Sequence, residues 1–482
     1  MKKFFEMIRN KWLLKATTTI ILVAIIIAGY IAVNWGVKQI DIEDFDFTTK
    51  KLYSLSNATK DKLKELESEI TIQLINMSNQ AYILEYADKY QKLSDKVIIE
   101  RIDDITTRKD LQTTYGIDNT VQLIIVKNGE KEKILTTADL VTYDYATYKQ
   151  IDRTEEAITN AIIEVTITEK PNIYIVDTNS YYDEEKSLGF IATELLNESN
   201  NVSLVDLLTT GKVPDDCDCL IITTLKKDLS ELERDSILAY INNGGKLLLL
   251  TSQNYILVDT PNLNQVLAQY GVSIEKGIVL EQDSKKMLNN RPEMIIADAN
   301  ASYMSDIDMS LKILMQNAGQ VKFAESQKLE ELGVQYEVIS KTSDKAFVRT
   351  EFNQATNSRT DKDSEEGACI LGAYVTKTIS EEKTSKLIIF ANEDFASTQI
   401  AIMGENYGDY FANVRNNKDV VLNSISHLIE RDETITIRKA VELDTYLVTD
   451  QEDVIIKTII FVLPAIIIIT GIGVWLYRKR RV

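Results

Sequence analysis

Two long apolar runs that contain no charged residue lie near opposite ends of this 482-residue chain. The first, at 16–37, has 22 residues, and a helix of that length can cross about 30 Å of hydrocarbon. The second, at 458–477, contains Pro464, which a membrane helix tolerates. It ends with Trp475 and Tyr477, two residue types typical of a membrane interface. The pattern predicts transmembrane helices at 16–37 and 454–477.

The charges beside these runs predict an orientation. Residues 1–15 carry a net charge of +4, and so does the tail at 478–482. Since the whole chain has a net charge of −19, the rest carries −27. Cytoplasmic flanks are rich in Lys and Arg, so both termini are predicted in the cytoplasm and 38–453 outside it.

The runs have two other interpretations. A cleaved signal peptide is the alternative for the first run, but its apolar part is longer than usual and no clear small-x-small site follows. Two buried core helices fit poorly with the basic flanks. We therefore expect retained anchors in contact with membrane lipid, in a two-pass protein of the cell membrane.

The acidic net charge disfavours a nucleic acid as a partner, because phosphates must be met by Lys and Arg. The three cysteines, Cys217, Cys219 and Cys369, form no CxxC motif. An odd number also cannot all pair within the chain, so no disulfide framework is expected. A metal or redox role for "PDDCDC" is the less favoured alternative to two small residues that lead into a strand.

After a juxtamembrane segment at 38–59, residues 60–168 show helices and strands in the order β-α-β-α-β-β-α. The strands are predicted at "ITIQLIN", at "VIIERID" and in "VQLIIVKNGEKEKIL", where Asn128-Gly129 favours a type I′ hairpin turn. This order is that of a thioredoxin-like domain. No CxxC follows its first strand, so a thiol-redox role has no nucleophile.

Residues 169–432 alternate strands and helices. The apolar strands "NIYIVDT", "LIITTL", "KLLLLTS" and "KLIIFA" predict a parallel sheet that is buried on both faces. Ser230 and Glu233 form a capping box for the helix between the second and third of these strands. We expect a doubly wound α/β domain. Within it, the polar segment 281–365 is expected to be rich in loops, and a connector at 433–453 follows.

Several stretches together resemble one family, the gliding-motility (GldG-type) auxiliary component of ABC transporters. They are "FDFTTKKLYSLSNAT", "AYINNGGKLLLLT", "SKLIIFANEDFAS", "IERDETITIRKA" and the ending "LPAIIIITGIGVWLYRKRR". The resemblance covers nearly the whole chain. It implies a thioredoxin-like domain followed by a domain similar to the glutamine-amidotransferase fold. It also implies an ABC permease and a separate ATPase subunit as partners.

One departure from the family bears on activity. Many relatives have a Gly-His-Gly-Glu-like turn after the first strand of the α/β domain, where this chain has Asp177-Thr178-Asn179-Ser180. Amidotransferase chemistry needs a Cys thiolate on a tight turn and a His base. No G-x-C-x-G occurs, and the one histidine, His427, lies in a predicted helix. We expect no enzyme activity, no cofactor and no metal.

Ligands of open α/β sheets bind beyond the carboxyl ends of the strands. This rule gives a candidate crevice for a cation or a sugar-like ligand, and ordinary loop and helix-cap chemistry is the more favoured alternative for the same residues. The candidate residues are Asp177, Thr178, Asn179, Thr251, Ser252, Gln253, Asn392, Glu393 and Asp394.

The chain has no G-x-x-x-x-G-K-[ST], so energy from ATP would have to come from another subunit. The leading hypothesis is a non-catalytic, doubly anchored auxiliary subunit of an ABC transport system, whose outward domains bind a substrate or a partner. The alternatives are a cell-envelope binding or sensing module that works without a transporter, and a hydrolase.

Overall fold

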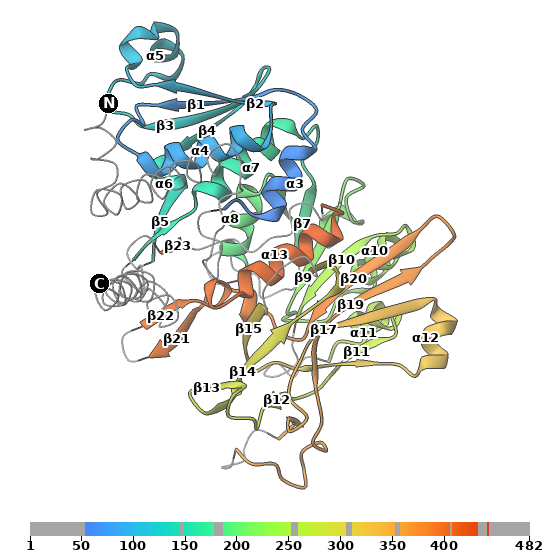
Figure 1. The fold of residues 1–482 in the computed structure, drawn as a ribbon. Helices are drawn as coiled ribbons and strands as arrows, with labels where there is room; N and C mark the ends of the chain where they lie inside the picture. Colours follow the sequence, from blue (N-terminus) through green and yellow to red (C-terminus); the bar gives the residue numbers. More distant parts are fainter. Residues whose placement is uncertain are drawn as a thin grey trace, which may run out of the picture. The chain divides into compact units, whose positions relative to one another are not determined.

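The computed structural model describes residues 54–144, 149–177, 187–251, 259–304, 311–351, 357–404, 407–431 and 441–442 (Figure 1). Contacts divide the chain into two compact units, 1–56 and 57–482, and the helices and strands of the described residues lie in the second. The predicted spans at 16–37 and 454–477 lie outside the described residues. None of the helices in the described part is long and apolar enough to cross a bilayer.

The first sheet has four strands in the order β2-β1-β3-β4. Strand β1 pairs in parallel with β2 and antiparallel with β3, and β3 pairs antiparallel with β4. The elements follow the predicted order. They are α3 (Asn57–Lys64), β1 (Ile70–Ile75), α4 (Ala81–Leu93), β2 (Val97–Ile102), η1 (Ile105–Thr107), α5 (Lys109–Tyr115), β3 (Leu123–Asn128), β4 (Lys131–Thr136) and α7 (Thr154–Thr166).

Between β4 and α7 the chain forms elements that the sequence did not indicate, namely α6 (Thr137–Leu140), β5 (Val141–Asp144) and β6 (Lys149–Asp152). Strand β6 also pairs antiparallel with the short β23 (Val441–Glu442), which lies in the segment predicted as a connector.

The hairpin between β3 and β4 is confirmed, but its predicted turn is wrong by one residue. Asn128 pairs with Lys131, so the two central residues are Gly129 and Glu130. Gly129 has φ +61°, whereas Glu130 has no positive φ. A positive φ at the first central position alone is the pattern of a type II′ turn, which places glycine there rather than at the second position.

A second sheet of 12 strands follows, and five of its strands are parallel. These five lie in the order β8-β7-β9-β10-β20, so the chain runs first to one side of β7 and then to the other. The sheet therefore has its topological switch point between β7 and β9. The strands are β7 (Asn172–Val176), β8 (Asn201–Val205), β9 (Cys219–Thr223), β10 (Lys246–Leu250) and β20 (Thr384–Phe390).

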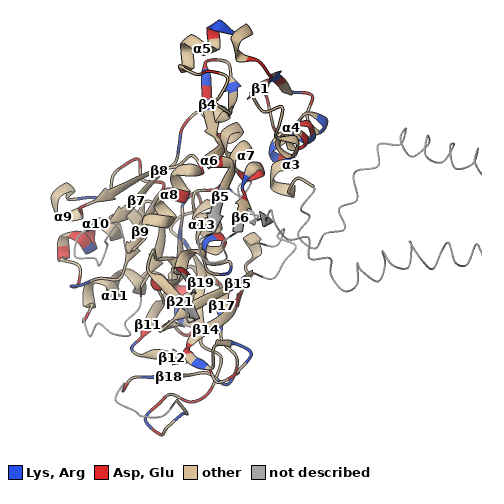
Figure 2. Cartoon of the chain, turned by 90° about the vertical axis from the view of Figure 1, so that its left-hand side faces the viewer, with Lys and Arg blue, Asp and Glu red and all other residues tan. Residues whose placement is uncertain are grey.

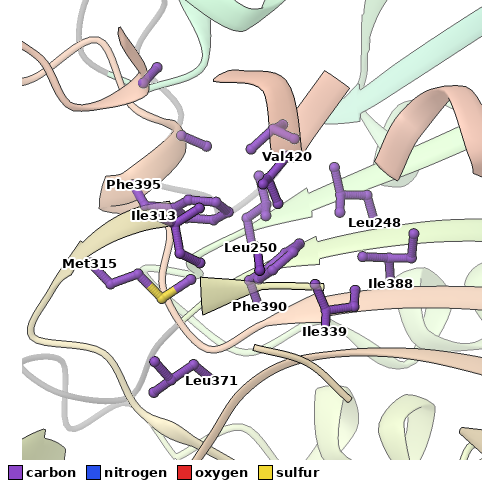
Figure 3. Close-up of a cluster of buried hydrophobic side chains, with 14 of the residues drawn as sticks. Leu248, Leu250, Ile313, Met315, Ile339, Leu371, Ile388, Phe390, Phe395 and Val420 are labelled. Atoms are coloured by element: carbon purple, nitrogen blue, oxygen red, sulfur yellow. The ribbon is translucent and has the colours of Figure 1, made fainter. Parts of the chain in front are cut away.

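Helices cover both faces of this parallel part. Alternate strand residues contribute to two separate cores because successive side chains point to opposite faces. One core contains Leu248, Leu250, Ile388 and Phe390 with α8 (Gly189–Asn197) and α13 (Asn417–Leu428), and Figure 3 shows part of it. The other core contains the intervening strand residues with α9 (Leu207–Thr210), α10 (Glu231–Asn242) and α11 (Pro261–Ala268).

The helix α10 illustrates how local sequence sets these elements. The Ser230 hydroxyl accepts a hydrogen bond from the Glu233 main-chain N–H at 3.2 Å, and the Glu233 carboxylate accepts one from the Ser230 N–H at 2.7 Å. This confirms the predicted capping box. The helix ends before Gly244, whose φ of +88° favours glycine.

The loop-rich character expected for 281–365 describes only part of this segment, because it also forms strands. Its strands β17 and β14 extend the sheet in an antiparallel manner beyond β20 and β19, so only the five parallel strands are doubly wound. Two short strands, β11 (Val272–Glu275) and β12 (Ile278–Leu280), precede this segment, and β19 (Ile370–Thr378) follows it. The elements within it are β13 (Met287–Leu288), β14 (Arg291–Ala299), η2 (Ser302–Met304), β15 (Leu311–Gln316), β16 (Gln320–Phe323), α12 (Ser326–Leu332), β17 (Val334–Lys341) and β18 (Phe347–Arg349).

The burial pattern explains why the sequence does not reveal these strands. In β14 buried and accessible residues are mixed, and β17 exposes Gln335 and Tyr336 while it buries Ile339. Antiparallel strands with one partly solvated face carry polar residues, so they lack the continuous apolar run of a parallel strand. The chain then continues through η3 (Asp394–Ala396), the hairpin of β21 (Ile400–Gly404) and β22 (Tyr407–Tyr410), and η4 (Phe411–Asn413) to reach α13.

Candidate functional site

The carboxyl ends of β9, β10 and β20 lie side by side in the parallel sheet. The register aligns Thr223 with Leu250, and Leu250 with Phe390. Of the predicted crevice residues, Asp177, Thr251, Asn392, Glu393 and Asp394 are among those described. Thr178, Asn179, Ser252 and Gln253 lie outside the described residues.

Two of the predicted residues have structural roles. The buried Asn392 side chain donates to the main-chain oxygen of Gln316 at 2.7 Å and accepts from the Phe395 N–H at 2.8 Å. It therefore ties the end of β15 to the turn η3. Thr251 is buried, and its N–H donates to the Phe390 oxygen at 3.2 Å. This bond continues the sheet beyond the end of β10.

Glu393 makes a contact that reaches across the sheet. Its carboxylate Oε2 accepts a hydrogen bond from the main-chain N–H of Thr224 at 2.9 Å. Thr224 directly follows β9, whereas Glu393 follows β20, and β10 lies between these two strands. The acid thus links the ends of two strands that are not neighbours.

Burial raises the pKa of Glu393, and the adjacent Asp394 adds to this effect. Hydrogen bonds from Thr224 and from the Ser187 side chain lower the pKa and oppose burial, but the net direction is upward. A buried carboxyl loses its hydration, and this disfavours the charged form. Glu393 is therefore easier to protonate than an exposed glutamate.

Asp394 is mostly buried, and burial alone raises its pKa from 3.8 to about 6. Within the described part of the chain, no ion pair or hydrogen bond to its carboxylate compensates for this burial. The next residue explains why the acid is held there. The Phe395 ring lies in the core with its centroid 4.9 Å from that of Phe390, and this anchors the turn (Figure 3).

Asp177 is exposed, and its main-chain N–H donates to the Val205 oxygen at 3.2 Å. Glu393 and Asp394 form an acid pair after β20, at which Thr224 and Ser187 meet Glu393.

Sequence reasoning missed both of these hydrogen-bond donors. The rule that ligands bind beyond the carboxyl ends of strands also applies to Thr224, because Thr224 stands at the carboxyl end of the predicted strand "LIITT". Ser187 lies ten positions after Asp177 and carries no comparable signal. The neighbouring Thr223 hydroxyl is fully buried and has no hydrogen-bond partner in the described part of the chain.

The cysteines are poor nucleophiles. Burial raises the pKa of Cys217 to about 12 and that of Cys369 to about 11, and it raises the pKa of Cys219 well above its usual value. The reactive form of cysteine is the thiolate, which these shifts suppress near neutral pH. The Cys217 Sγ lies 3.6 Å from the Tyr240 hydroxyl.

His427 lies in α13 and packs among aromatic rings. It stacks on Tyr303 with centroids 4.4 Å apart, and it meets the Tyr374 ring edge-on at 4.9 Å. His427 thus lies in a helix, as predicted from the sequence, and it is partly buried. Among the described residues, no group of three or more His, Cys, Asp or Glu side chains could hold a metal ion. The site offers proton exchange and hydrogen bonding rather than a nucleophile.

Residues 170–424, which are just over half of the chain, match the family described as an ABC-type uncharacterized transport system (ABC_transp_aux). The chain belongs to this family. The matched region of this ABC-type auxiliary component begins just before β7 and ends within α13, so it includes the whole parallel sheet and the acid pair.

Solved structures resemble the ABC-type auxiliary component only distantly. The N-terminal domain of mmIFT52 is 11% identical with a TM-score of 0.39, and the match covers 53% of this chain and 97% of that one. ThuA-like proteins from Bacteroides uniformis and Parabacteroides merdae are 10% and 9% identical, with TM-scores of 0.32 and 0.33. Those matches cover 55% and 57% of this chain and 94% of each relative. We draw no conclusion from likenesses this weak, and no curated protein matches the chain.

Proposed function

We propose that this protein is a non-catalytic subunit of an ABC transport system, anchored in the membrane at both ends. Its domains between the anchors would lie outside the cytoplasm and bind a substrate or an envelope partner. The single observation that carries the proposal is the family match over 170–424. The two uncharged runs with basic flanks support the anchoring and the orientation.

The sequence indicates that this chain does not itself hydrolyse ATP. The chain has no G-x-x-x-x-G-K-[ST], the loop that cradles nucleotide phosphates. The ATPase would therefore be a separate cytoplasmic chain, and the two helices of this protein would pack against a permease. Such helices associate by close packing in lipid, so their sequence matters as well as their length.

The absence of catalysis is supported by the state of the nucleophiles. Acyl transfer by a cysteine needs a thiolate and a neighbouring base. Burial raises the pKa of each of the three cysteines, and His427 packs against Tyr303 and Tyr374 in the core. We infer a binding or coupling role for the α/β region.

We also propose a fold for each of the two domains. The strand order β2-β1-β3-β4, with β3 antiparallel to β1, supports a thioredoxin-like first domain over 60–168. The parallel order β8-β7-β9-β10-β20, with helices on both faces, supports a domain related to the glutamine-amidotransferase fold over 169–432. In that domain the carboxyl edge with Glu393 and Asp394 is the candidate for a ligand contact.

Crosslinking in intact membranes tests the transport assignment, with the crosslinked partners identified by mass. The expected result is recovery of this chain with a multi-span permease and an ATPase. A variant in which 458–477 is replaced by a leucine-alanine helix of equal length should stay in the membrane but lose these partners. Recovery of the protein without partners, both from membranes with the unmodified chain and from membranes with the variant, would favour an envelope sensing module and contradict the proposal.

Protease added to whole cells tests the orientation separately. The body between the runs should be cleaved, and a short tag at either terminus should stay protected until the membrane is opened. Release of the protein into the soluble fraction without detergent would refute the anchoring. A phenotype for the triple substitution of Cys217, Cys219 and Cys369 by serine, in a protein that folds normally, would instead support a thiol hydrolase.

A further inference from the structure

In the described part of the chain, the large sheet ends at β8, and no other described strand pairs with the outer edge of β8. Figure 2 labels β8 next to β7, and within the described residues β8 pairs with β7 alone. The Asn201 N–H donates to the Pro171 oxygen at 2.8 Å, and the Val205 oxygen accepts from the Asp177 N–H at 3.2 Å. In a parallel pair alternate residues face the neighbour, so the main-chain groups of the intervening Val202 and Leu204 face outward.

This edge lacks the usual protection. Natural sheets guard their edges with charged side chains, proline or bulges, because an unpaired strand is a template for another strand. The sequence of β8, "NVSLV", has no charge and no proline, and its register with β7 is regular. Leu204 is 48% exposed. Val202 packs on the core that contains α8, so Leu204 points to the same side of the sheet, where the 52% exposed Leu196 of α8 also lies.

We propose that β8 is an interface with a second copy of this chain, in which the two β8 strands pair antiparallel about a two-fold axis at Ser203. In this register Val202 of each copy lies opposite Leu204 of the other, and Ser203 lies opposite Ser203. The outward N–H and C=O groups of Val202 and Leu204 then form about four inter-chain hydrogen bonds. The five-residue sequence is therefore its own complement, as a closed two-fold interface requires.

Charge placement favours this occupant. The pairing sets Asp206 of one copy opposite Asn200 of the other, so no two like charges face each other. Asp206 is already engaged, because its carboxylate caps α9 by accepting from the Leu208 N–H at 2.9 Å and from the Thr209 N–H at 3.2 Å. The apolar side chains of Val202 and Leu204 from both copies form one strip between the two α8 helices.

The size of the contact sets its strength. One short strand from each copy with a few leucines buries less surface than the roughly 1,200–2,000 Å² of a stable complex. We therefore expect a weak dimer with a Kd on the order of micromolar, as in transient interfaces.

The first test uses a cysteine at the axis, in the Ser203→Cys variant of the full-length chain in mild detergent. Residues that face each other without exchanging hydrogen bonds across an antiparallel pair have Cα atoms about 4.5 Å apart, which is within the range of a disulfide. Oxidation should give a covalent dimer on a non-reducing gel. The unmodified chain, with the partly exposed Cys217, is the control and should stay monomeric. Absence of the crosslink, or a crosslink to a different polypeptide in cells, would overturn the proposal.

The second test is disruption by charge. Leu204→Lys should weaken dimerisation at least about tenfold, measured by sedimentation velocity from about 0.1 to about 50 μM. Leu232→Lys is the matched control, because Leu232 is also 48% exposed but lies on α10. Equal dimerisation of the two variants, or a monomer at every concentration of the unmodified chain, would refute the interface. Both lysines replace exposed side chains, so both variants should fold.

Discussion

The buried acid after β20 gives a prediction whose size follows from the structure. In Asp394→Asn the carboxyl is replaced by a neutral group of nearly the same shape. Burial raises the pKa of Asp394 from 3.8 to about 6, with no compensating ion pair among the described residues. A shift of about two pKa units corresponds to about 3 kcal/mol that the folded state loses when this acid ionises.

The sign of the pH dependence is fixed by the raised pKa. Below about pH 4 the acid is protonated in both the folded and the unfolded chain, so it costs nothing. Between about pH 4 and pH 6 the unfolded chain ionises first, and the free energy of unfolding falls as the pH rises. Above about pH 6 the cost is complete, and Asp394→Asn should then recover up to about 3 kcal/mol.

Urea denaturation at pH 7.5 and at pH 4.0, read by pulse proteolysis, measures this difference. With an m-value of about 3 kcal/mol per molar, the variant's midpoint should rise by up to about 1 M at pH 7.5 and by no more than about 0.2 M at pH 4.0. Asp344→Asn, at an exposed loop position, is the control and should change the unfolding free energy by less than about 0.5 kcal/mol. An equal gain at both pH values, or none at pH 7.5, would refute the reasoning.

Three further substitutions test other parts of the α/β region by urea denaturation. Glu393→Ala should lower the free energy of unfolding by about 1–3 kcal/mol, because the amide that follows β9 loses its acceptor; no change would mean that water replaces the carboxylate freely. Arg349→Met should cost about 3–5 kcal/mol at pH 7, because the fully buried Asp363 would keep only its hydrogen bonds from Thr360, and adding Asp363→Leu should restore part of the loss. Because Arg349 lowers the pKa of Asp363, the unmodified chain should lose this stabilisation as the pH falls below about 4. Gly372→Ala should cost about 1–3 kcal/mol, since the added Cβ would lie 2.3 Å from the Phe390 ring, and a tolerated alanine would show that the ring can move.

The candidate site could be predicted from the sequence only in part. The rule that ligands bind at the carboxyl ends of parallel strands located Glu393 and Asp394 correctly as neighbours of a strand end. It could not tell that Asn392 is a structural cap, nor that Glu393 contacts Thr224. That contact joins positions 169 residues apart, and it depends on the order of the strands.

The hairpin and the segment 281–365 mark a second limit. The residue types at 128–130 predicted a turn, but the register of the pairing decided which residues occupy its centre. In 281–365 the one-sided strands carry enough polar residues to look like loops. Their pairing with distant strands stabilises them, and local propensity contributes less in a sheet than in a helix.

The sequence by itself determined the apolar ends, the buried strands β7, β9, β10 and β20, and the capping box of α10, because each depends on residues within a few positions of one another. Tertiary structure alone decided the placement of β7 between β8 and β9, the position of β8 at the end of the sheet in the described part of the chain and the burial of Asp394. Strand order and burial arise from contacts between residues far apart in the chain. Short-range patterns do not encode these contacts, because the free energy that selects among them is that of the whole packed core.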